Sequence, residues 1–292
     1  MWLKMRRTCL AVLLSVCLVG VPAGCSTSPA TGERQFNPLS REREVELGKE
    51  AAPQFLKDYG GPIPSGTVRE TVSDLGQQLA KVSERPDLPW EFHAVNTSQI
   101  NAFALPGGKI FITRGLLEKM DSMAQLAGVL GHEVGHVTDR HVGERMGQAV
   151  GVNVATTVAG IFAQRSEEQW LQVLGVGAQV GGSLYLLKYS RGQEYTSDRL
   201  GLRYMTKVGY DPQGQVEVMK ILKAAGGGNG IEWLSTHPAP QSRIDRLQRI
   251  IDEEYPNRSQ YKRGEQRYRE RVLQPMEGLP PAKDVPKKQQ GG

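Results

Sequence analysis

Two histidines that stand four residues apart, with a glutamate next to the first, are the residues of this chain best spaced for chemistry. They form the run His132-Glu133-Val134-Gly135-His136. In a helix, both imidazoles project from one face about one turn apart, so that both can bind a single Zn²⁺ ion. Glu133 then lies beside the metal and can take a proton from a water whose pKa the zinc lowers toward ~7. The run therefore predicts a site that activates water as a nucleophile at neutral pH.

The residues around this run are those of a helix. Leu126, Leu130 and Val134 place an apolar residue at every fourth position, and Asp121 or Ser122 can cap the start. A helix with two ordinary histidines would show the same periodicity. The chain has only five histidines, however, so two of them at this spacing favour the metal site.

Catalytic zinc needs a third protein ligand, and the sequence offers two candidates. His141 follows the first histidine by nine residues, but the metzincin pattern needs a glycine and a later histidine where Asp139 and Val142 stand. We therefore interpret His141 as a packing or hydrogen-bonding histidine on the same helix. Glu194 is the better candidate, because Asp198 shares its helix face and can accept the remaining ring N–H of a zinc-bound histidine. A solvated acid pair is the alternative.

Two short segments before the histidine helix have the composition of strands. Residues 90–95 and 109–113 carry bulky and β-branched side chains, and Pro106-Gly107-Gly108 predicts a turn between them. An antiparallel edge beside the helix would let an extended peptide add as a further strand, with its scissile carbonyl over the metal. Such binding uses mainly backbone groups and predicts broad specificity for unfolded segments, although a simple supporting hairpin fits the same pattern.

The rest of the periodicity predicts mainly helices. Helices are expected over about 40–58, over 67–82, after the capping residue Asp211, and around 244–251. Many helices with one small sheet make an α+β fold. The apolar, glycine-rich stretch 146–187 is broken into runs shorter than the ~20 residues of a membrane span, so we expect two buried or lid-forming helices there.

At four places the chain resembles the HtpX- and BepA-like gluzincin metallopeptidases, between about residues 39 and 255. The resemblance implies a mainly helical zincin-like domain, with a small antiparallel sheet beside the histidine helix and one zinc ion per chain. The shared segments are Asn101 to Leu117, His132 to His141, the Glu194 and Asp198 helix, and Ser235-Thr236-His237-Pro238.

The resemblance also implies a role for each matching residue of the predicted zinc site. By it, His132, His136 and Glu194 are the zinc ligands. Glu133 is the general base, and Asp198 orients a zinc-bound histidine.

His237 reaches the active site in similar proteins, where it either stabilises the oxyanion or takes the fourth zinc position as a self-inhibiting latch. A neutral imidazole beside the metal could do either, and a loop histidine without a role is the remaining interpretation. Arg243, six residues later, could anchor this segment or bind substrate. We also assign substrate binding to Asn101, Ala102 and Phe103.

The first 24 residues predict a signal peptide, because three basic residues precede an apolar run at 9–21 that is too short to span a membrane. Ala23-Gly24 before Cys25 resembles a bacterial lipobox, which implies a lipidated Cys25 at the mature N-terminus. Ordinary cleavage is the alternative. All three cysteines fall in or at the end of this leader. Because Ser26 follows Cys25, we expect a lipid anchor in the outer membrane, facing the periplasm.

Charge argues against a nucleic-acid partner. The formal charge is +5, and removal of the three basic leader residues lowers it to +2. We divide the mature chain into a tether at 25–38, a zinc metallopeptidase domain at 39–255 and a basic, partly disordered tail at 256–292. The tail could contact anionic lipid or remain solvated.

These inferences predict a zinc-dependent metalloendopeptidase of the bacterial cell envelope, similar to compact single-domain lipoprotein members of the family. By resemblance, its substrates are misfolded envelope or outer-membrane proteins, and contact with the outer-membrane assembly machinery is a further expectation. The alternative is a latent or non-proteolytic, chaperone-like assembly factor whose zinc site is closed.

Overall fold

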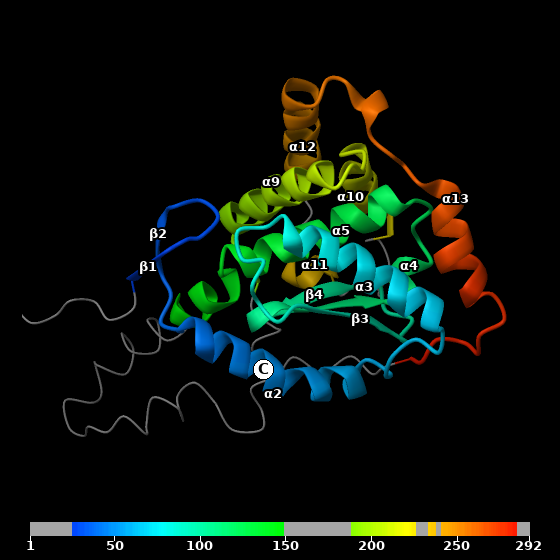
Figure 1. The fold of residues 1–292 in the computed structure, drawn as a ribbon, viewed down its shortest axis with the longest axis horizontal. Coiled ribbons are helices and arrows are strands. Elements are labelled where there is room, and N and C mark those ends of the chain that lie inside the picture. The colour runs from blue at the N-terminus through cyan, green and yellow to red at the C-terminus, as the bar shows by residue number, and fades with distance from the viewer. Residues whose placement is uncertain (1–24, 149–187, 226–232, 238–240, 285–292) are drawn as a thin grey trace, which may run out of the picture.

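The computed structural model describes residues 25–148, 188–225, 233–237 and 241–284. A central helix, α5 (Met123–Thr138), is buried along its whole length. A small sheet covers one side of α5, while α9 (Arg191–Lys207) and α10 (Gln213–Ala225) pack on the other (Figure 1). Because α5 carries both histidines of the predicted site, this layering places them in the middle of the molecule.

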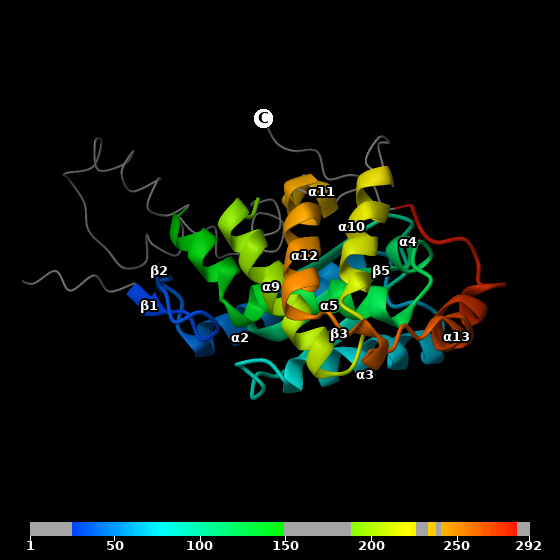
Figure 2. The ribbon, with the colours of Figure 1, turned by 90° about the horizontal axis from the view of Figure 1, so that it is seen from above.

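The outer layers are helices that cover this centre. α2 (Arg41–Asp58) lies across the far face of the sheet, and α3 (Gly66–Lys81) packs against both the sheet and α5. α12 (Gln241–Glu254) packs over α9 and α10 (Figure 2). Short elements complete the described chain: β1 (Cys25–Thr27), β2 (Arg34–Phe36), α4 (Arg114–Leu117), α11 (Trp233–Thr236), η2 (Arg258–Gln260), α13 (Glu265–Tyr268), η3 (Arg269–Leu273) and η4 (Gln274–Met276).

Four of the long helices start in the same way. In each, a serine just before the first turn accepts a hydrogen bond from the backbone N–H three residues later, which satisfies one of the donors that a helix start leaves free. The capping serines are Ser40 of α2, Ser65 of α3, Ser122 of α5 and Ser190 of α9. The predicted helices over 40–58 and 67–82 and around 244–251, and the one that Asp211 caps, are confirmed within a few residues.

The sheet is mixed, which corrects one detail of the sequence prediction. β3 (Glu91–Val95) and β5 (Lys109–Thr113) pair in parallel, while β4 (Ala102–Leu105) pairs antiparallel with β5. The strand order is β3-β5-β4. The predicted turn at Pro106–Gly108 is present as η1, but it joins β4 to β5. β3 and β4 are therefore the two edge strands of this sheet, and β4 is the one that packs closely on α5.

Alternate residues of β4 belong to different hydrophobic clusters. Ala102 and Ala104 pack in the main core with α3 and α5, whereas Phe103 and Leu105 pack with aromatic residues of α2. This alternation follows from the two-residue period of a strand. Small residues on the α5 face let the edge strand lie close to the histidine helix. The α+β prediction is confirmed, with a mainly helical domain and a small sheet.

The segment after α12 belongs to the folded domain, although the sequence suggested a partly disordered tail from residue 256. Tyr268, Val272 and Met276 are buried in the main core. Lys283 forms a bridge with Thr97. These three buried residues are spaced four apart within a highly charged stretch, and Leu273 and Leu279 pack beside them. The end of the predicted tail, from residue 285, lies outside the described residues.

Two predictions concern residues that the structure does not describe. The signal peptide over 1–24 lies outside the described residues, and so does nearly all of the stretch at 146–187. Within the part of the chain that is described, no helix is long and apolar enough to cross a membrane.

A buried cluster of ion pairs and hydrogen bonds connects α2 to the C-terminal end of α5. Glu44 accepts hydrogen bonds from Arg85 and Arg140, each at 2.8 Å, and Arg85 also donates to the carbonyl of Val137 at 3.0 Å. The Glu44 side chain is only 3% exposed. Removing one partner of such a buried pair leaves the opposite charge without compensation.

We expect the Glu44→Gln variant to lose about 2–3 kcal/mol of unfolding free energy, measured by urea denaturation. Glu46→Gln on the same helix is the control, because its pair with Arg43 is exposed and should contribute less than about 1 kcal/mol. Equal losses in the two variants would contradict a stabilising role for the buried cluster.

Candidate metal centre

Glycines allow α5 and α9 to approach closely where they cross. A Cβ atom at Gly135 would come within 3.1 Å of the Ser197 Cα, and one at Gly201 would come within 3.0 Å of the His132 backbone nitrogen. Side chains at these positions would push the two helices apart. The close crossing brings the acidic face of α9 against the histidine face of α5, and so joins residues that are about 60 positions apart in the sequence.

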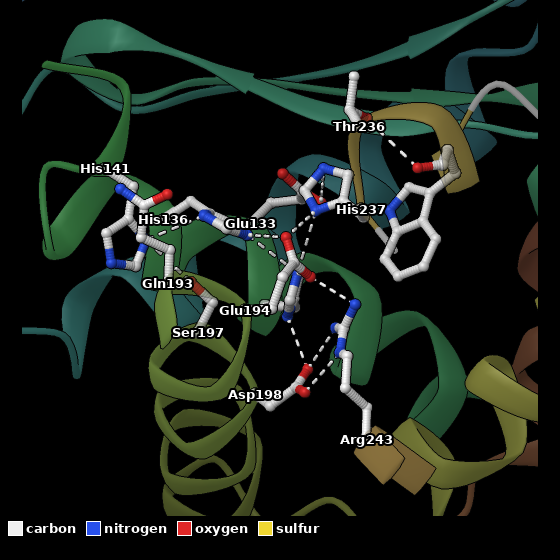
Figure 3. Close-up of polar contacts among 12 residues, drawn as sticks. Glu133, His136, His141, Gln193, Glu194, Ser197, Asp198, Thr236, His237 and Arg243 are labelled. Carbon is white, nitrogen blue, oxygen red and sulfur yellow. Dashed lines mark hydrogen bonds and ion pairs between the residues drawn. The ribbon is translucent and has the colours of Figure 1, made fainter. Parts of the chain in front are cut away.

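Four donor groups converge between these helices: His132, His136, Glu194 and His237. Their donor atoms all lie within 4.8 Å of one another, and all four residues are buried. His132 and His136 come from α5, Glu194 comes from α9, and His237 follows α11. Figure 3 shows His136, Glu194 and His237 close together between these elements. The structure thus brings together both histidines of the HExxH run, the predicted third ligand and the histidine of the Thr-His-Pro segment.

The spacing of these donor atoms fits a tetrahedral zinc ion. The Nε2 atoms of His132 and His136 are 3.0 Å apart, and the His237 Nδ1 lies 3.4 Å from the His132 Nε2. Glu194 Oε1 is 3.6 Å from the His136 Nε2. Ligands at ~2.0–2.1 Å from a tetrahedral zinc are separated by roughly 3.3 Å, so the cluster could hold the ion with little rearrangement. Nitrogen and carboxylate donors are also the ligands that zinc prefers.

Asp198 sets the tautomer of His132. Its Oδ1 lies 3.0 Å from the His132 Nδ1, so the ring proton sits on Nδ1 and the lone pair of Nε2 points into the cluster. Burial by itself raises the pKa of Asp198, but the positive charge of Arg243 and the hydrogen bonds from Arg243 and His132 hold it below its ordinary value. Asp198 therefore stays ionised and keeps His132 in the form that binds metal.

Arg243 lies behind the acid pair rather than in a substrate cleft. Its Nε donates to Asp198 Oδ2 at 2.8 Å and its Nη2 donates to Asp198 Oδ1 at 2.6 Å, while Nη1 pairs with Glu194 (Figure 3). The side chain is 1% exposed. Of the two roles that the sequence left open, this geometry supports anchoring, and it corrects the assignment of Arg243 to substrate binding.

Glu133 is a buried carboxylate whose two oxygens have no hydrogen-bond partner among the described residues. Its Oε1 lies 3.8 Å from the His237 Nε2. Burial, helped by the negative charge of Glu194, raises the pKa of Glu133 to about 8 in the metal-free site. A carboxylate beside the metal ligands whose pKa lies near neutrality has the properties of a general base.

His237 is fixed in the centre by aromatic stacking. The Trp233 ring lies against it, with centroids 4.7 Å apart and planes at 10°, and the Tyr189 ring lies at 4.8 Å. The His237 Nδ1 is 2.9 Å from Glu194 Oε1. His237 thus occupies the fourth corner of the cluster, the position that a catalytic zinc site leaves for water or substrate.

His141 contacts the cluster from outside, and it is not on the histidine helix as the sequence suggested. α5 ends at Thr138, and Arg140 takes a positive φ of 58° before a new helical run over 141–148. The His141 Nδ1 lies 2.9 Å from the His136 Nδ1, and its Nε2 lies 2.8 Å from Asp139 Oδ2. The break in the helix is what turns His141 toward the outer nitrogen of His136.

A narrow cleft leads from the cluster along the edge strand. It is lined by residues of β4, by Val142 and Arg145 of the run 141–148, and by Tyr189 and His237. Of the three residues that the sequence assigned to substrate binding, Phe103 lines this cleft, whereas Asn101 and Ala102 are buried and do not line it.

Sequence reasoning missed three residues of this site: Arg145, Tyr189 and Trp233. Tyr189 directly precedes the capping serine of α9, and Trp233 lies four residues before His237. Those positions are the only local signals that could have drawn attention to these two aromatics. Arg145 carries no local signal of its own.

Comparison with known proteins matches this chain to a peptidase family and to relatives named as proteases. The family model for peptidase family M48 matches residues 67–251. The mitochondrial metalloendopeptidase OMA1 of Schizosaccharomyces pombe is 30% identical over 229 residues, covering 77% of this chain and 66% of the relative. The beta-barrel assembly-enhancing protease of Escherichia coli is 27% identical over 258 residues, covering 84% of this chain and 52% of the relative. The chain thus spans between half and two thirds of the length of these curated relatives.

Proposed function

The chain belongs to peptidase family M48, and from that premise we propose that it is a zinc metalloendopeptidase of the bacterial cell envelope. The observation that carries the proposal is the buried cluster of His132, His136 and Glu194 beside Glu133, a carboxylate without a hydrogen-bond partner among the described residues. A metal site that served structure alone would have no use for such a base. The relatives that match most of this chain are named as metalloendopeptidases or proteases.

Each residue of the cluster then has a distinct task. His132, His136 and Glu194 would hold the zinc, which when bound supplies a Lewis acid and lowers the pKa of water. Glu133 accepts the proton of the attacking water and passes it to the leaving amine. Asp198 keeps His132 in the correct tautomer, supported in turn by Arg243.

The edge strand supplies a place for the substrate. β4 has only β5 as a neighbour in the described sheet, and its outer side borders the cleft that ends at His237. An extended peptide that adds to β4 would present its backbone carbonyl to the metal end of the cleft. Backbone pairing of this kind selects unfolded or extended segments, so we propose unfolded or misfolded envelope proteins as substrates.

The position of His237 favours a latched enzyme. With His237 at the fourth corner, no corner of the tetrahedron is left for water or a peptide carbonyl. The imidazole must therefore move aside before the chemistry can start. Activity would depend on the fraction of molecules in which the latch is open.

The His237→Ala variant tests this latch. We expect its kcat/KM on unfolded casein to rise by roughly tenfold or more, because a latch closed in over about 90% of molecules hides most of the activity. Bound zinc should stay near one per chain, since three ligands remain. His93→Ala, which removes a histidine of β3 outside the cluster, should leave activity unchanged. A fall of about 10²-fold or more would instead show that His237 stabilises the oxyanion.

We further propose that Cys25 carries a lipid anchor and that the domain faces the periplasm from the outer membrane. The lipobox-like sequence supports the anchor, and the name of the Escherichia coli relative, a beta-barrel assembly-enhancing protease, supports an envelope substrate and contact with outer-membrane assembly. Labelling with a radioactive fatty acid, compared between the parent and a Cys25→Ala variant, tests the anchor.

A non-proteolytic assembly factor is the second candidate, favoured by the closed fourth corner. It would bind clients in the cleft and keep its zinc for stability. Casein assays of the parent and His237→Ala proteins, each with zinc quantified, separate the two functions. Full zinc with no hydrolysis in either protein would support the assembly factor and contradict the peptidase.

A further inference from the structure

A buried guanidinium forms part of the cleft wall next to the metal centre. Arg145 is 6% exposed and belongs to the helical run 141–148. Its Cζ lies 3.9 Å from the centre of the Tyr189 ring, which supports one face of the guanidinium. Its Nε and Nη2 have no hydrogen-bond partner among the described residues. None of the described carboxylates forms an ion pair with it either.

Such an arrangement needs a partner that the described residues do not supply. A guanidinium stays protonated under all ordinary conditions, so Arg145 remains a cation even where burial lowers its pKa. An unpaired buried cation destabilises a protein unless an anion compensates it. The contact with Tyr189 offsets part of this cost, but it leaves the Nε–H and Nη2–H donors unused.

The unused donors are the ones suited to a carboxylate. Nε–H and Nη2–H lie parallel on one edge of the guanidinium plane, and this edge can bind both oxygens of one carboxylate. On a peptide substrate, the group with this geometry is an acidic side chain or the terminal carboxylate. Neutral side chains offer only single acceptors and cannot neutralise the charge.

Arg145 is also in the right place to meet a bound peptide. The cleft is lined by residues of β4 together with Arg145, Tyr189 and His237. A peptide that adds to β4 would pass along this cleft, and one of its side chains would point toward Arg145. With His237 in place the cavity holds only about 20 Å³, so the carboxylate enters as the latch opens.

We propose that Arg145 is a specificity residue that binds a substrate carboxylate close to the scissile bond. This inference rests on the proposed function, because it names the substrates that the same cleft prefers. They are unfolded segments with an acidic residue, or a chain end, at the position that faces Arg145.

Matched peptides test the proposal in the parent protein. In one series a Glu or Gln is moved through each position on both sides of the cleaved bond, and each peptide is made with a free and an amidated C-terminus. We expect kcat/KM to favour Glu over Gln by about tenfold to a hundredfold at one position. A preference that follows the free C-terminus would identify the chain end as the source of the carboxylate.

Variants then assign the preference to Arg145. In Arg145→Gln the ratio of kcat/KM between Glu and Gln peptides should fall to about one, and this ratio is the readout whatever the absolute rate of the variant. Arg145→Lys keeps the charge but loses the paired donors, so an intermediate ratio is expected, and it serves as the second variant if the first does not fold. Arg199→Gln is the control, because that exposed arginine pairs with Glu254 outside the cleft. Its ratio should match that of the parent.

Two results would overturn the proposal: cleavage of neutral peptides without an acidic preference at any position, or an acidic preference that survives in Arg145→Gln. Failure of the proposed function is distinguishable from both. The same peptide pairs are titrated by fluorescence anisotropy against the Glu133→Gln protein, with and without Arg145→Gln. Carboxylate recognition is then measured as a ratio of dissociation constants even if no peptide is cleaved.

Discussion

Replacing Glu133 with Gln is expected to lower kcat/KM on unfolded protein by about 10²–10⁴-fold while bound zinc stays near one per chain. Gln has the same shape but cannot accept a proton, so the attacking water loses its base. Since the two oxygens of Glu133 make no hydrogen bond to His132, His136 or Glu194, the change breaks no contact that holds the three metal ligands. The measurement is casein hydrolysis beside zinc quantification by atomic absorption.

Stability supplies the control for this prediction. Because the pKa of Glu133 is raised to about 8 in the folded, metal-free protein, folding favours its protonated form, and the parent loses stability as pH rises from about 4.5 toward 8. Gln is neutral throughout. Chelator-treated Glu133→Gln should therefore melt higher than chelator-treated parent near pH 8 and close to it at pH 4. Unchanged hydrolysis in this variant would refute the role of Glu133 as the base.

Local patterns in the sequence predicted those parts of the site that a single helix determines. His132 and His136 were predicted correctly because residues four positions apart lie on the same face of α5. Ser122 caps that helix by accepting a hydrogen bond from a backbone N–H only three residues later. Glu194 and Asp198 share one face of α9 for the same reason. Each of these relations lies within one turn of a helix.

The parts that the sequence did not predict depend on contacts between distant segments. β4 lies between β3 and β5 in the sequence, but it lies at an edge of the sheet in space. β3 and β5 are therefore neighbours in the sheet, and they run parallel. Arg145 and Tyr189 meet across a stretch of more than forty residues. The end of α5 at Arg140 is also unmarked, because a non-glycine residue takes the positive φ there, without a proline or glycine to signal the break.

Arg243→Met should weaken both the fold and the metal site more than any other single change to the residues around the cluster. The substitution removes the cation that pairs with Asp198 and Glu194, two carboxylates that are 2% and 1% exposed. Leaving buried charges uncompensated costs about 3–5 kcal/mol of unfolding free energy. Zinc affinity should fall by about 10–100-fold, because Asp198 then no longer holds His132 firmly.

Urea denaturation measures the stability of Arg243→Met and competitive zinc titration measures its zinc affinity. The loss of stability should also depend on pH. The pKa of Asp198 is lower in the folded protein than in the unfolded chain, where it is ~3.9. Ionised Asp198 therefore stabilises the fold above pH ~3.9, and this contribution is lost as the pH falls through the folded-state pKa. The loss of unfolding free energy in Arg243→Met should therefore be largest near neutral pH and should shrink in acid, where the carboxylates no longer need a counterion.

The control is Arg246→Met, one turn further along α12. It removes an arginine that lies 4.9 Å from the Tyr195 ring centre and should cost less than about 1 kcal/mol of unfolding free energy. Equal losses in the two variants, or a deficit of Arg243→Met that does not change with pH, would mean that Arg243 acts through packing and not through its charge.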